Sequence, residues 1–340
     1  MFDTKILDPT QENIFYCAGL IKKGEVVGMP TETVYGLAAD AFNESAVKKI
    51  FAAKGRPCDN PLIVHISHID MLYELTSYVP DSAAALAKKF WPGPLTMILP
   101  KTDKVPFVTS GGLDTVGIRM PENGVARLLI DASGVPLAAP SANLSGKPSP
   151  TTAFHVYDDL KDLIPAILDG GECSVGVEST VITFDSDDTV RILRPGAVTK
   201  EALGTVVKNV VLDNGILNEV DANTKVSSPG MKYKHYSPKA NVVLIKGSFE
   251  AFLEYAEKNS ADGTYLMCFD GDNVPDSFNT VFYGENSGEQ ARHLFSVLRE
   301  LDKMGAKTVL ARVPDQNGVG LAVYNRILRA AAFDIIEVGE

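Results

Sequence analysis

The sequence has few of the features that mark secreted, membrane-spanning or zinc-binding proteins. Its four cysteines (Cys17, Cys58, Cys173 and Cys268) lie far apart and form no C-x-x-C pair, which argues against a disulfide framework and a zinc knuckle. No apolar run approaches the roughly 18 residues that span a bilayer. Met1–Pro9 lacks the basic flank and long apolar stretch of a secretory signal. We therefore expect a soluble, cytoplasmic protein that does not contact membranes.

Common signatures of nucleotide-binding and catalytic sites are also missing. The sequence has no G-x-x-x-x-G-K-[ST] phosphate loop, no H-E-x-x-H zinc motif and no G-x-S-x-G nucleophile elbow. Gly318-x-Gly320 lacks the third glycine of a dinucleotide site. His65 and His68 are three residues apart at an expected strand end, a poor geometry for a metal. The sequence thus offers no obvious nucleophile and no protein metal site.

Basic residues are outnumbered by acidic ones, and the net charge is -11. An acidic balance argues weakly against broad, non-specific binding of nucleic acid, which normally needs a basic face. It does not argue against a small anionic substrate, because salt screens charges beyond a Debye length of about 8 Å. The positions of the cations therefore matter more than their number.

The chain of 340 residues, with 45% hydrophobic and 22% charged residues, predicts about two globular domains. From Val26 to about Gly204, short apolar runs alternate with amphipathic stretches, which predicts an α/β sheet covered by helices. The sheet is expected to be mixed, because Thr180–Leu193 has the pattern of a hairpin. From about Asn241 a second alternation predicts a smaller, doubly wound α/β domain.

The expected elements can be stated residue by residue. In the first region the strands are Val26–Met29, Leu62–Ile66, Leu95–Leu99, Val116–Arg119, Leu137–Ala139, Ala166–Leu168, Thr180–Phe184 and Val190–Leu193. The helices are Glu44–Ala53, Asp81–Phe90, Val125–Asp131 and Thr151–Leu160. In the second region the strands are Val242–Ile245, Tyr265–Phe269, Val281–Tyr283, Thr308–Ala311 and Ile335–Val338, and the helices are Phe249–Lys258, Gly288–Met304 and Leu321–Ala331.

The segment Lys225–Lys239 between the two regions has an unusual composition. It contains four lysines and no acidic residue, together with two prolines, a glycine, Tyr233 and Tyr236. One interpretation is a solvated linker between domains. Tyrosines, however, need a surface to pack against, so a second interpretation is a loop that closes over a bound anion.

Polar segments follow several of the expected strands and helices. Pro30–Leu37 carries hydroxyl groups that suit a small ligand, or it is a turn that caps the next element. Lys54 and Arg56, after helix Glu44–Ala53, either complement the helix dipole or bind a polyphosphate. Arg119 ends an apolar strand and needs an anion, which is either a structural carboxylate or that of a substrate.

Small residues and hydroxyls are densest in Ala138–Thr151, ahead of an expected helix. Small side chains let backbone N–H groups approach a ligand closely, and a helix start favours an anion. A long capped loop is the alternative interpretation. Glu178-Ser179-Thr180 and Arg194-Pro195-Gly196 lie at the two ends of the expected hairpin.

Taken together and in this order, the segments resemble the threonylcarbamoyl-AMP synthase family, whose enzymes are built on a YrdC-like domain. The resemblance covers nearly all of Pro30–Thr199 and is carried by PTETVYGL, KGRPCDNPLIVHI, WPGPLTMIL, VGIRMP, APSANLSGKPSPT, GVESTV and RPGAVT. Pro229–Pro238, PGMKYKHYSP, is similar to the linker of the longer, two-domain members.

The resemblance implies a fold and a reaction. Residues 1–208 would form the YrdC-like catalytic domain, an open twisted mixed sheet with helices. Residues 209–240 would be a linker that closes over the active site, and residues 241–340 a smaller Rossmann-like domain. The reaction implied is that of a nucleotidyltransferase: L-threonine, bicarbonate or CO2, and ATP give threonylcarbamoyl-adenylate and pyrophosphate. The product would pass to a threonylcarbamoyl transferase that modifies tRNA, so tRNA is an indirect partner.

The resemblance also implies site residues. Lys54, Arg56, Ser141 and Asn143 would form a catalytic tetrad around the phosphates. The other nucleotide-binding positions would be Asn60, Thr115, Ser149, Arg194 and Tyr236. The positions that hold L-threonine would be Thr33, His65, Arg119, Ala139 and Ser179. Mg²⁺ would be bound mainly through the phosphate oxygens of ATP.

Two other functions remain as alternatives at this point. An RNA-binding or ribosome-associated module is one, but the net charge of -11 and the lack of an aromatic stacking array argue against it. A carbamoyl-transferring relative that uses carbamoyl phosphate is the other. Such relatives usually carry acylphosphatase-like or zinc-finger-like segments, and this sequence shows neither.

Overall fold

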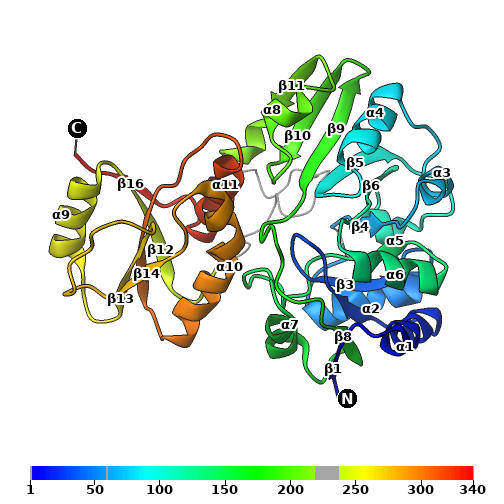
Figure 1. Cartoon of the computed structure of the whole chain (residues 1–340), viewed down its shortest axis with the longest axis horizontal. Helices are drawn as coiled ribbons and strands as arrows, with labels where there is room; N and C mark the ends of the chain where they lie inside the picture. Colours follow the sequence, from blue (N-terminus) through cyan, green and yellow to red (C-terminus); the bar gives the residue numbers. More distant parts are fainter. Residues whose placement is uncertain (1, 59, 219–236, 340) are drawn as a thin grey trace.

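The computed structural model describes residues 2–58, 60–218 and 237–339, and these form two α/β units that lie side by side (Figure 1). Each unit is built on its own sheet. Among the described residues, none of the helices has the length and apolar character needed to cross a membrane.

The first unit contains an eleven-stranded sheet in the order β1-β8-β2-β3-β7-β4-β6-β5-β9-β10-β11. Its strands are β1 (Lys5–Leu7), β2 (Val27–Met29), β3 (Gly36–Asp40), β4 (Ile63–His65), β5 (Leu95–Pro100), β6 (Thr115–Arg119), β7 (Leu137–Ala138), β8 (Ala166–Leu168), β9 (Thr180–Ser186), β10 (Thr189–Arg194) and β11 (Asn209–Leu212). Strands β4 and β6 pair in parallel, whereas β2 with β3 and β9 with β10 pair antiparallel. The predicted mixed sheet and the predicted hairpin are both confirmed.

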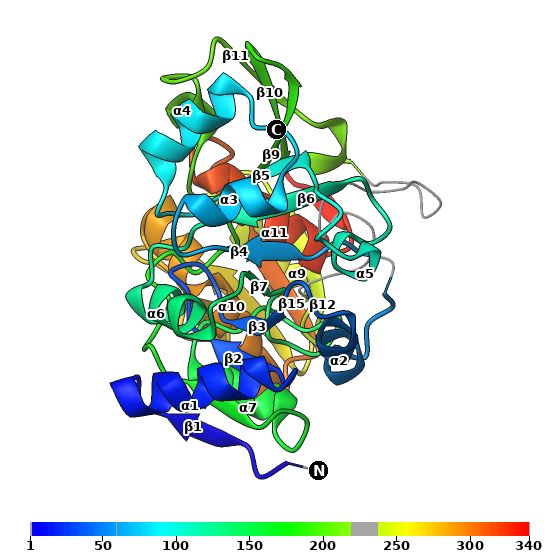
Figure 2. The ribbon, with the colours of Figure 1, turned by 90° about the vertical axis from the view of Figure 1, so that its right-hand side faces the viewer.

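Helices cover this sheet mainly on the side turned away from the second unit (Figures 1 and 2). They are α1 (Gln11–Lys22), α2 (Glu44–Lys54), α3 (Asp70–Leu75), α4 (Asp81–Phe90), α5 (Phe107–Ser110), α6 (Gly124–Ser133), α7 (Ala153–Leu160) and α8 (Lys200–Leu203), with a 3-10 turn η1 (Asn214–Ile216). Their buried apolar side chains join those of the sheet in one continuous core. Because the helices occupy that side, the opposite side of the sheet is left to face the second unit.

The second unit contains five parallel strands in the order β14-β13-β15-β12-β16. They are β12 (Asn241–Lys246), β13 (Thr264–Cys268), β14 (Thr280–Phe282), β15 (Thr308–Arg312) and β16 (Ile335–Glu337), and the helices are α9 (Phe249–Asn259), α10 (Ser287–Lys303) and α11 (Gly320–Ala330). Helices α10 and α11 lie toward the first unit and α9 lies on the far face (Figure 1). The predicted doubly wound second unit is confirmed.

The two units share buried apolar contacts. Val34 and Val177 belong to the first unit by sequence, yet they pack in one cluster with Leu294, Leu298 and Ile327 of the second. Burial of apolar surface stabilises such an arrangement by roughly 25 cal/mol for each Å² removed from water. The interface is therefore part of the folded core and not a chance contact of surfaces.

The structure adds elements that the sequence analysis did not predict. β1 and α1 precede the first predicted strand, and Gly36–Asp40 forms β3 where a loop was predicted up to Leu37. Asn209–Leu212, which was assigned to the linker, forms a parallel strand beside β10. The domain boundaries 1–208, 209–240 and 241–340 remain a prediction, and the closing segment Pro229–Pro238 lies almost wholly outside the described residues.

Candidate active site

Polar loops from separate parts of the first unit surround one cavity. The cavity is open to solvent and holds about 750 Å³ of empty space when that solvent is counted. Its lining residues are Thr31, Thr33, Val34, Gly36, Lys54, Arg56, Ile63, His65, Arg119, Ala139, Pro140, Ser141, Asn143, Ser145, Gly146, Glu178, Ser179 and Arg194. The predicted phosphate tetrad and all the predicted threonine positions are in this set.

Helix α2 delivers Lys54 and Arg56 to the cavity. Asn43 caps its first turn, and Gly55 ends it in the left-handed region with a φ of 61°, a conformation that favours glycine. The chain therefore turns sharply between the two cations. The glycine between Lys54 and Arg56 in the sequence is therefore the residue that permits this turn.

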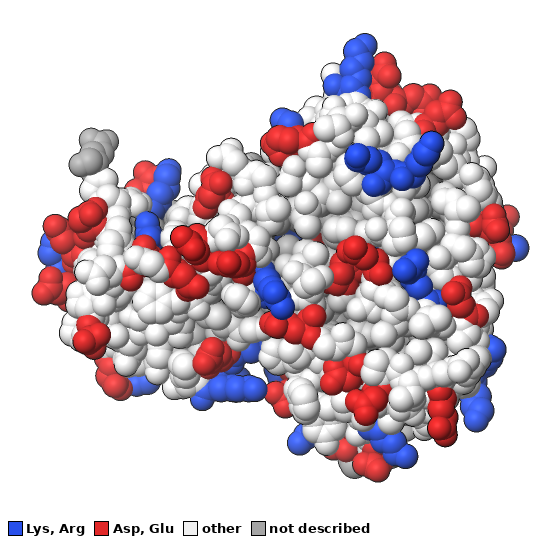
Figure 3. Space-filling model, in the orientation of Figure 1, with Lys and Arg blue, Asp and Glu red and all other residues white. Residues whose placement is uncertain are grey.

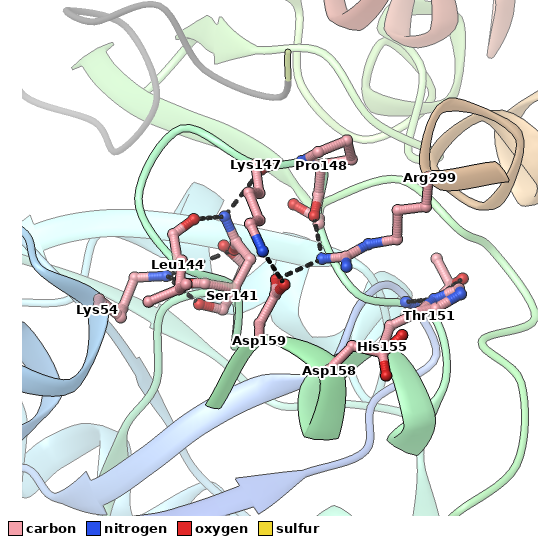
Figure 4. Close-up of polar contacts among 12 residues, drawn as sticks. Lys54, Ser141, Leu144, Lys147, Pro148, Thr151, His155, Asp158, Asp159 and Arg299 are labelled. Carbon is pink, nitrogen blue, oxygen red and sulfur yellow. Dashed lines mark hydrogen bonds and ion pairs between the residues drawn. The ribbon is translucent and has the colours of Figure 1, made fainter. Parts of the chain in front are cut away.

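The ammonium of Lys54 is buried and holds the neighbouring loop (Figure 4). It donates to the backbone oxygen of Ser141, to the backbone oxygen of Asn143 at 2.6 Å, and to Asn143 Oδ1 at 3.4 Å. Burial, followed by the charge of Arg56, lowers the pKa of Lys54 well below its ordinary value. Lys54 thus fixes the loop that carries Ser141 and Asn143, a role that the sequence analysis did not predict.

Arg119 at the end of β6 is almost fully buried. Its Nη2 lies 2.7 Å from Glu32 Oε1, and its Nη1 donates to Thr33 Oγ1 at 2.7 Å. The other oxygen of Glu32 accepts a hydrogen bond from the backbone N–H of Glu122 at 3.1 Å. The sequence analysis left the carboxylate partner of Arg119 open; within the structure it is Glu32.

His65 ends β4 directly beside Arg119, with which it is in register. Burial, and next the charge of Arg119, lowers the pKa of His65 to about 3, so the imidazole is neutral near pH 7. A neutral imidazole has one donor and one acceptor nitrogen. Within the described part of the chain, Nδ1 has no hydrogen-bond partner.

Ser179 and Arg194 close the cavity on the side of the β9–β10 hairpin. Arg194 Nη2 donates to Ser179 Oγ at 3.1 Å, and its Nε donates to the Ser179 backbone oxygen at 3.0 Å. Ser179 Oγ also lies 2.7 Å from Thr96 Oγ1 in β5. The hydroxyl is therefore oriented by an arginine on one side and by a threonine on the other.

Glu178 lines the cavity and is nearly fully buried. It accepts a hydrogen bond from Ser149 Oγ at 2.6 Å and one from Arg326 Nε, in helix α11, at 2.7 Å. Burial acts to raise the pKa of Glu178, but the charges of Arg326 and Arg194 and these hydrogen bonds lower it below its ordinary value overall. Glu178 is therefore an ionised group in the cavity wall, and the sequence analysis gave it no role.

Some predicted positions lie behind the cavity or beyond the described residues. Asn60 and Ser149 are buried and Thr115 is half-buried at the start of β6, and none of the three is among the residues that line the cavity. Tyr236 lies outside the described residues. In the described ranges, no three His, Cys, Asp or Glu side chains are grouped so that they could hold a metal ion.

Glu32 and Glu178 are the residues that the sequence analysis missed. Each sits within a motif that was recognised, PTETVYGL and GVESTV, beside the residue that was assigned. The signal that could have found them is a carboxylate flanked by apolar or small residues, because a buried carboxylate requires a cation. Arg119 and Arg326 are those cations.

Two family models match this chain, one over most of the first unit and one over most of the second. A family model described as "Telomere recombination", for the Sua5, YciO and YrdC proteins, matches residues 19–196. A second, described as the C-terminal domain of threonylcarbamoyl-AMP synthase, matches residues 198–332.

Full-length relatives are similar over nearly the whole chain. The threonylcarbamoyl-AMP synthase of Pyrococcus abyssi is 44% identical over 325 residues, which cover 94% of each chain. That of Bacillus subtilis is 43% identical, with 98% of this chain and 97% of the relative covered. The crystal structure of Pyrococcus abyssi Sua5 complexed with L-threonine superimposes with a TM-score of 0.89 at 41% identity, covering 100% of this chain and 99% of that one. This chain belongs to the threonylcarbamoyl-AMP synthase family and has the two-domain form of it.

Proposed function

We propose that this protein makes L-threonylcarbamoyl-adenylate from L-threonine, bicarbonate or CO2, and ATP, with release of pyrophosphate. One observation carries the proposal: the cavity brings cations suited to a triphosphate next to an arginine, a histidine and hydroxyls suited to an amino acid. The similarity to a relative that was solved with L-threonine supports the amino-acid half.

The threonine half of the cavity would consist of Thr33, His65, Arg119, Ala139 and Ser179. Arg119 would bind the threonine carboxylate while Glu32 and Thr33 hold its guanidinium in place. A hydrogen bond to a charged group contributes about 1.5–3 kcal/mol. The neutral His65 would pair with the hydroxyl or the amine of threonine. A site that hydrogen-bonds a hydroxyl rejects an analogue lacking it by up to ~10⁴-fold.

The nucleotide half would consist of the tetrad Lys54, Arg56, Ser141 and Asn143, together with Arg194. We propose that Asn60, Thr115 and Ser149 support this half from behind the lining and that Tyr236 contacts the nucleotide. Mg²⁺ would accompany ATP, bound chiefly by phosphate oxygens, which it prefers to an all-protein site. The ion would offset the charge that develops on the phosphates.

The chemistry needs no nucleophile from the protein. The threonine nitrogen adds to the carbon of CO2 and loses a proton, which gives a carbamate. A carbamate oxygen then forms a bond to the α-phosphorus of ATP, while the bond from that phosphorus to pyrophosphate breaks. Phosphoryl and nucleotidyl transfers depend mainly on positioning and charge neutralisation, which the lining arginines and the backbone N–H groups of the Ser141 loop are suited to supply.

The wider setting is proposed from the family. The product would pass to a threonylcarbamoyl transferase that modifies tRNA, so tRNA would be met only through that partner. Asn209–Leu212 is a strand of the sheet, so within the predicted linker 209–240 the part that would close over the bound substrates is Pro229–Pro238. The reaction would take place in the cytoplasm. Figure 3 shows basic and acidic side chains interspersed on one face of the molecule, whereas the electrostatic footprint of direct RNA binding is a basic patch.

The test is to measure pyrophosphate release by the purified protein with ATP and Mg²⁺. Release should require both threonine and bicarbonate, and ¹³C-labelled bicarbonate should appear in an adenylate product by mass spectrometry. Serine, which keeps the hydroxyl, and 2-aminobutyrate, which lacks it, are matched substrate controls. No release with the complete mixture, combined with salt-dependent RNA binding, would favour the RNA-binding alternative and overturn the proposal.

A further inference from the structure

The second unit reaches the cavity wall through buried arginines. Helices α10 and α11 carry Arg299 and Arg326, which are 8% and 1% exposed. Arg326 is the largest of the fully buried side chains among the described residues. Full burial of an arginine occurs almost only where its charge is paired, so the partners of these two residues indicate what they do.

Arg326 pairs with the carboxylate that lines the cavity. Its Nε donates to Glu178 Oε2 at 2.7 Å, while Glu178 Oε1 accepts the Ser149 hydroxyl at 2.6 Å. Arg326 Nη2 also lies 3.4 Å from the backbone oxygen of Pro195, the residue after Arg194. One guanidinium of the second unit thus contacts both ends of the hairpin that carries Ser179 and Arg194.

Arg299 binds the segment that precedes Ser149, behind the residues that line the cavity (Figure 4). Its Nη2 donates to the backbone oxygen of Pro148 at 2.5 Å and to Asp159 Oδ2 at 2.7 Å. The other oxygen of Asp159 accepts from Lys147 at 2.8 Å. The segment after Ser141 and Asn143 is therefore attached to helix α10 as well as to helix α7.

We propose that Arg326 is a positioning residue for nucleotide binding: from the second unit it neutralises Glu178 and holds that carboxylate in the orientation that leaves the cavity able to accept a triphosphate. The inference rests on the proposed function and gives the second unit a part in it. Arg326 is not a lining residue of the cavity, so it acts through Glu178 and Ser149 and not by contact with the substrate.

The physical reason is the position of the Glu178 charge. A carboxylate in the wall of a cavity repels phosphate groups, and the low polarity of a buried site strengthens the repulsion. With Arg326 beside Glu178, the two side chains form a neutral pair, and the ionised carboxylate of Glu178 accepts the hydrogen bond from Ser149. Without Arg326, the charge of Arg194 still acts on Glu178, but the nucleotide also needs that arginine. Glu178 then either repels the triphosphate or takes up a proton and changes its hydrogen bond with Ser149. Both outcomes weaken binding of ATP.

The first experiment compares Michaelis constants in the pyrophosphate-release assay. Arg326→Met keeps an unbranched chain of about the length of the arginine stem and removes the charged guanidinium. It should raise KM for ATP by about tenfold or more, with a smaller change in KM for threonine and in kcat. Arg326→Lys, which keeps the charge but loses the guanidinium geometry, should fall between Arg326→Met and the unaltered protein.

The decisive variant is the double substitution Glu178→Gln with Arg326→Met. Glutamine has the shape of glutamate and no charge, so it does not need Arg326, and KM for ATP should recover most of the loss. A purely structural role for Arg326 predicts no such rescue, because the double variant loses the ion pair just as the single variant does. An unchanged KM for ATP in Arg326→Met, or a double variant as weak as the single one, would overturn the proposal.

A matched control tests whether any interface contact has the same effect. Arg292 in helix α10 pairs with Glu172 of the first unit at 3.4 Å, and the two side chains are 46% and 40% exposed. Arg292→Met should leave KM for ATP within about twofold, since exposed pairs contribute little. A loss equal to that of Arg326→Met would indicate general docking of the units and would overturn the specific role.

Binding of ATP is also measured by titration calorimetry in the absence of threonine. This readout separates the inference from the proposed function, because it needs no turnover. If the unaltered protein binds ATP but releases no pyrophosphate, the proposed reaction fails and the role of Arg326 is still tested by affinity. If Arg326→Met does not fold, the double variant of Glu178→Gln with Arg326→Met is compared with Glu178→Gln alone. Because the charge of Glu178 is absent from both, their affinities for ATP should be equal, and a much weaker double variant would count against the inference.

Discussion

Glu32 and Arg119 form a buried ion pair, with 2.7 Å between Oε1 and Nη2 and each side chain 4% exposed. The two residues come from different parts of the first unit, since Glu32 lies in the loop after β2 and Arg119 at the end of β6. The pair therefore ties the proposed threonine site together across the sheet. It also means that Arg119 already has an anion before any substrate binds.

Substitution of Glu32 should lower the stability of the folded protein, because it breaks this buried ion pair. Glu32→Ala leaves Arg119 as a buried charge without its carboxylate, and breaking such a pair costs about 3–5 kcal/mol. We expect a loss of that size in the free energy of unfolding by urea. Glu25→Ala, which removes the acid of an exposed pair with Lys49, should cost about 1 kcal/mol or less. Equal losses in the two variants would contradict a buried, tightly held pair.

His65 should remain neutral and should make the protein less stable in acid. Its folded pKa of about 3 lies below the ordinary value of 6.5, so the unfolded state binds more protons between these pH values. Stability contributed by the neutral imidazole is therefore fully present above pH 6.5 and falls toward pH 3, by up to about 1.4 kcal/mol for each pH unit.

The measurement is urea unfolding of the unaltered protein and of His65→Gln from pH 7 to pH 5. The variant should lose less stability over this range. His155 has a pKa lowered to about 4, by burial and then by Arg299 and Lys303, so its contribution has the same sign and is common to both proteins. The difference between the two proteins isolates His65. Parallel curves would show that the imidazole does not titrate as described.

Lys54 should influence kcat because it positions the loop that carries Ser141 and Asn143. Lys54→Met removes its three contacts with Ser141 and Asn143, so we expect kcat to fall by roughly 10²-fold or more, because misplacement by about 1 Å has an effect of that size. Hydrogen exchange of the Ala142 and Ser145 amides should accelerate. Lys49→Met, on the exposed side of the same helix, is the control and should change neither quantity.

Much of the architecture follows from sequence pattern because it depends on burial. The β9–β10 segment consists of two apolar runs joined by a short polar turn, a pattern typical of a hairpin. Helix α10 repeats apolar residues along one face, and Leu294, Leu298 and Leu301 on it are all buried. Helix α1 was not predicted because two of its large apolar residues, Phe15 and Tyr16, are exposed. They lie outside the apolar face that its buried residues form, so the helical periodicity of the sequence is weak. β1 (KIL) lies at the edge of the sheet and is at most half-buried, so it lacks the buried apolar run that marks the equally short β2 and β8.

The sequence motifs contain many of the residues that line the candidate cavity, but they do not indicate the partners of those residues. The motifs indicate that Arg119, Lys54 and Ser149 are special, but a motif does not state which group lies opposite in space. Glu32 is 87 residues from Arg119, and Glu178 is 148 residues from Arg326. Such pairs form only when the sheet and the second unit have assembled, so they depend on tertiary structure and leave no local signal.

The last prediction concerns Gly196, which lies where two chain segments touch. A Cβ at this position would lie 2.7 Å from the backbone oxygen of Glu178 and would also meet the backbone nitrogen of Thr180. Both atoms are backbone, so neither segment can yield by rotating a side chain. Gly196→Ala should therefore push the hairpin end that carries Arg194 away from Ser179, and we expect a loss of about 1–3 kcal/mol in stability together with a higher KM for ATP.

Gly124 provides the matched control, because a Cβ there has no heavy atom within 4 Å and the residue opens helix α6. Gly124→Ala should leave KM unchanged and alter stability by no more than about 1 kcal/mol. If Gly196→Ala retained normal stability and affinity, the hairpin would have to be free to move, and the hydrogen bonds of Arg194 to Ser179 could not be what positions this wall. If instead stability fell while KM for ATP stayed normal, Gly196 would be needed for folding alone, and the assignment of Arg194 to the nucleotide site would lose its support.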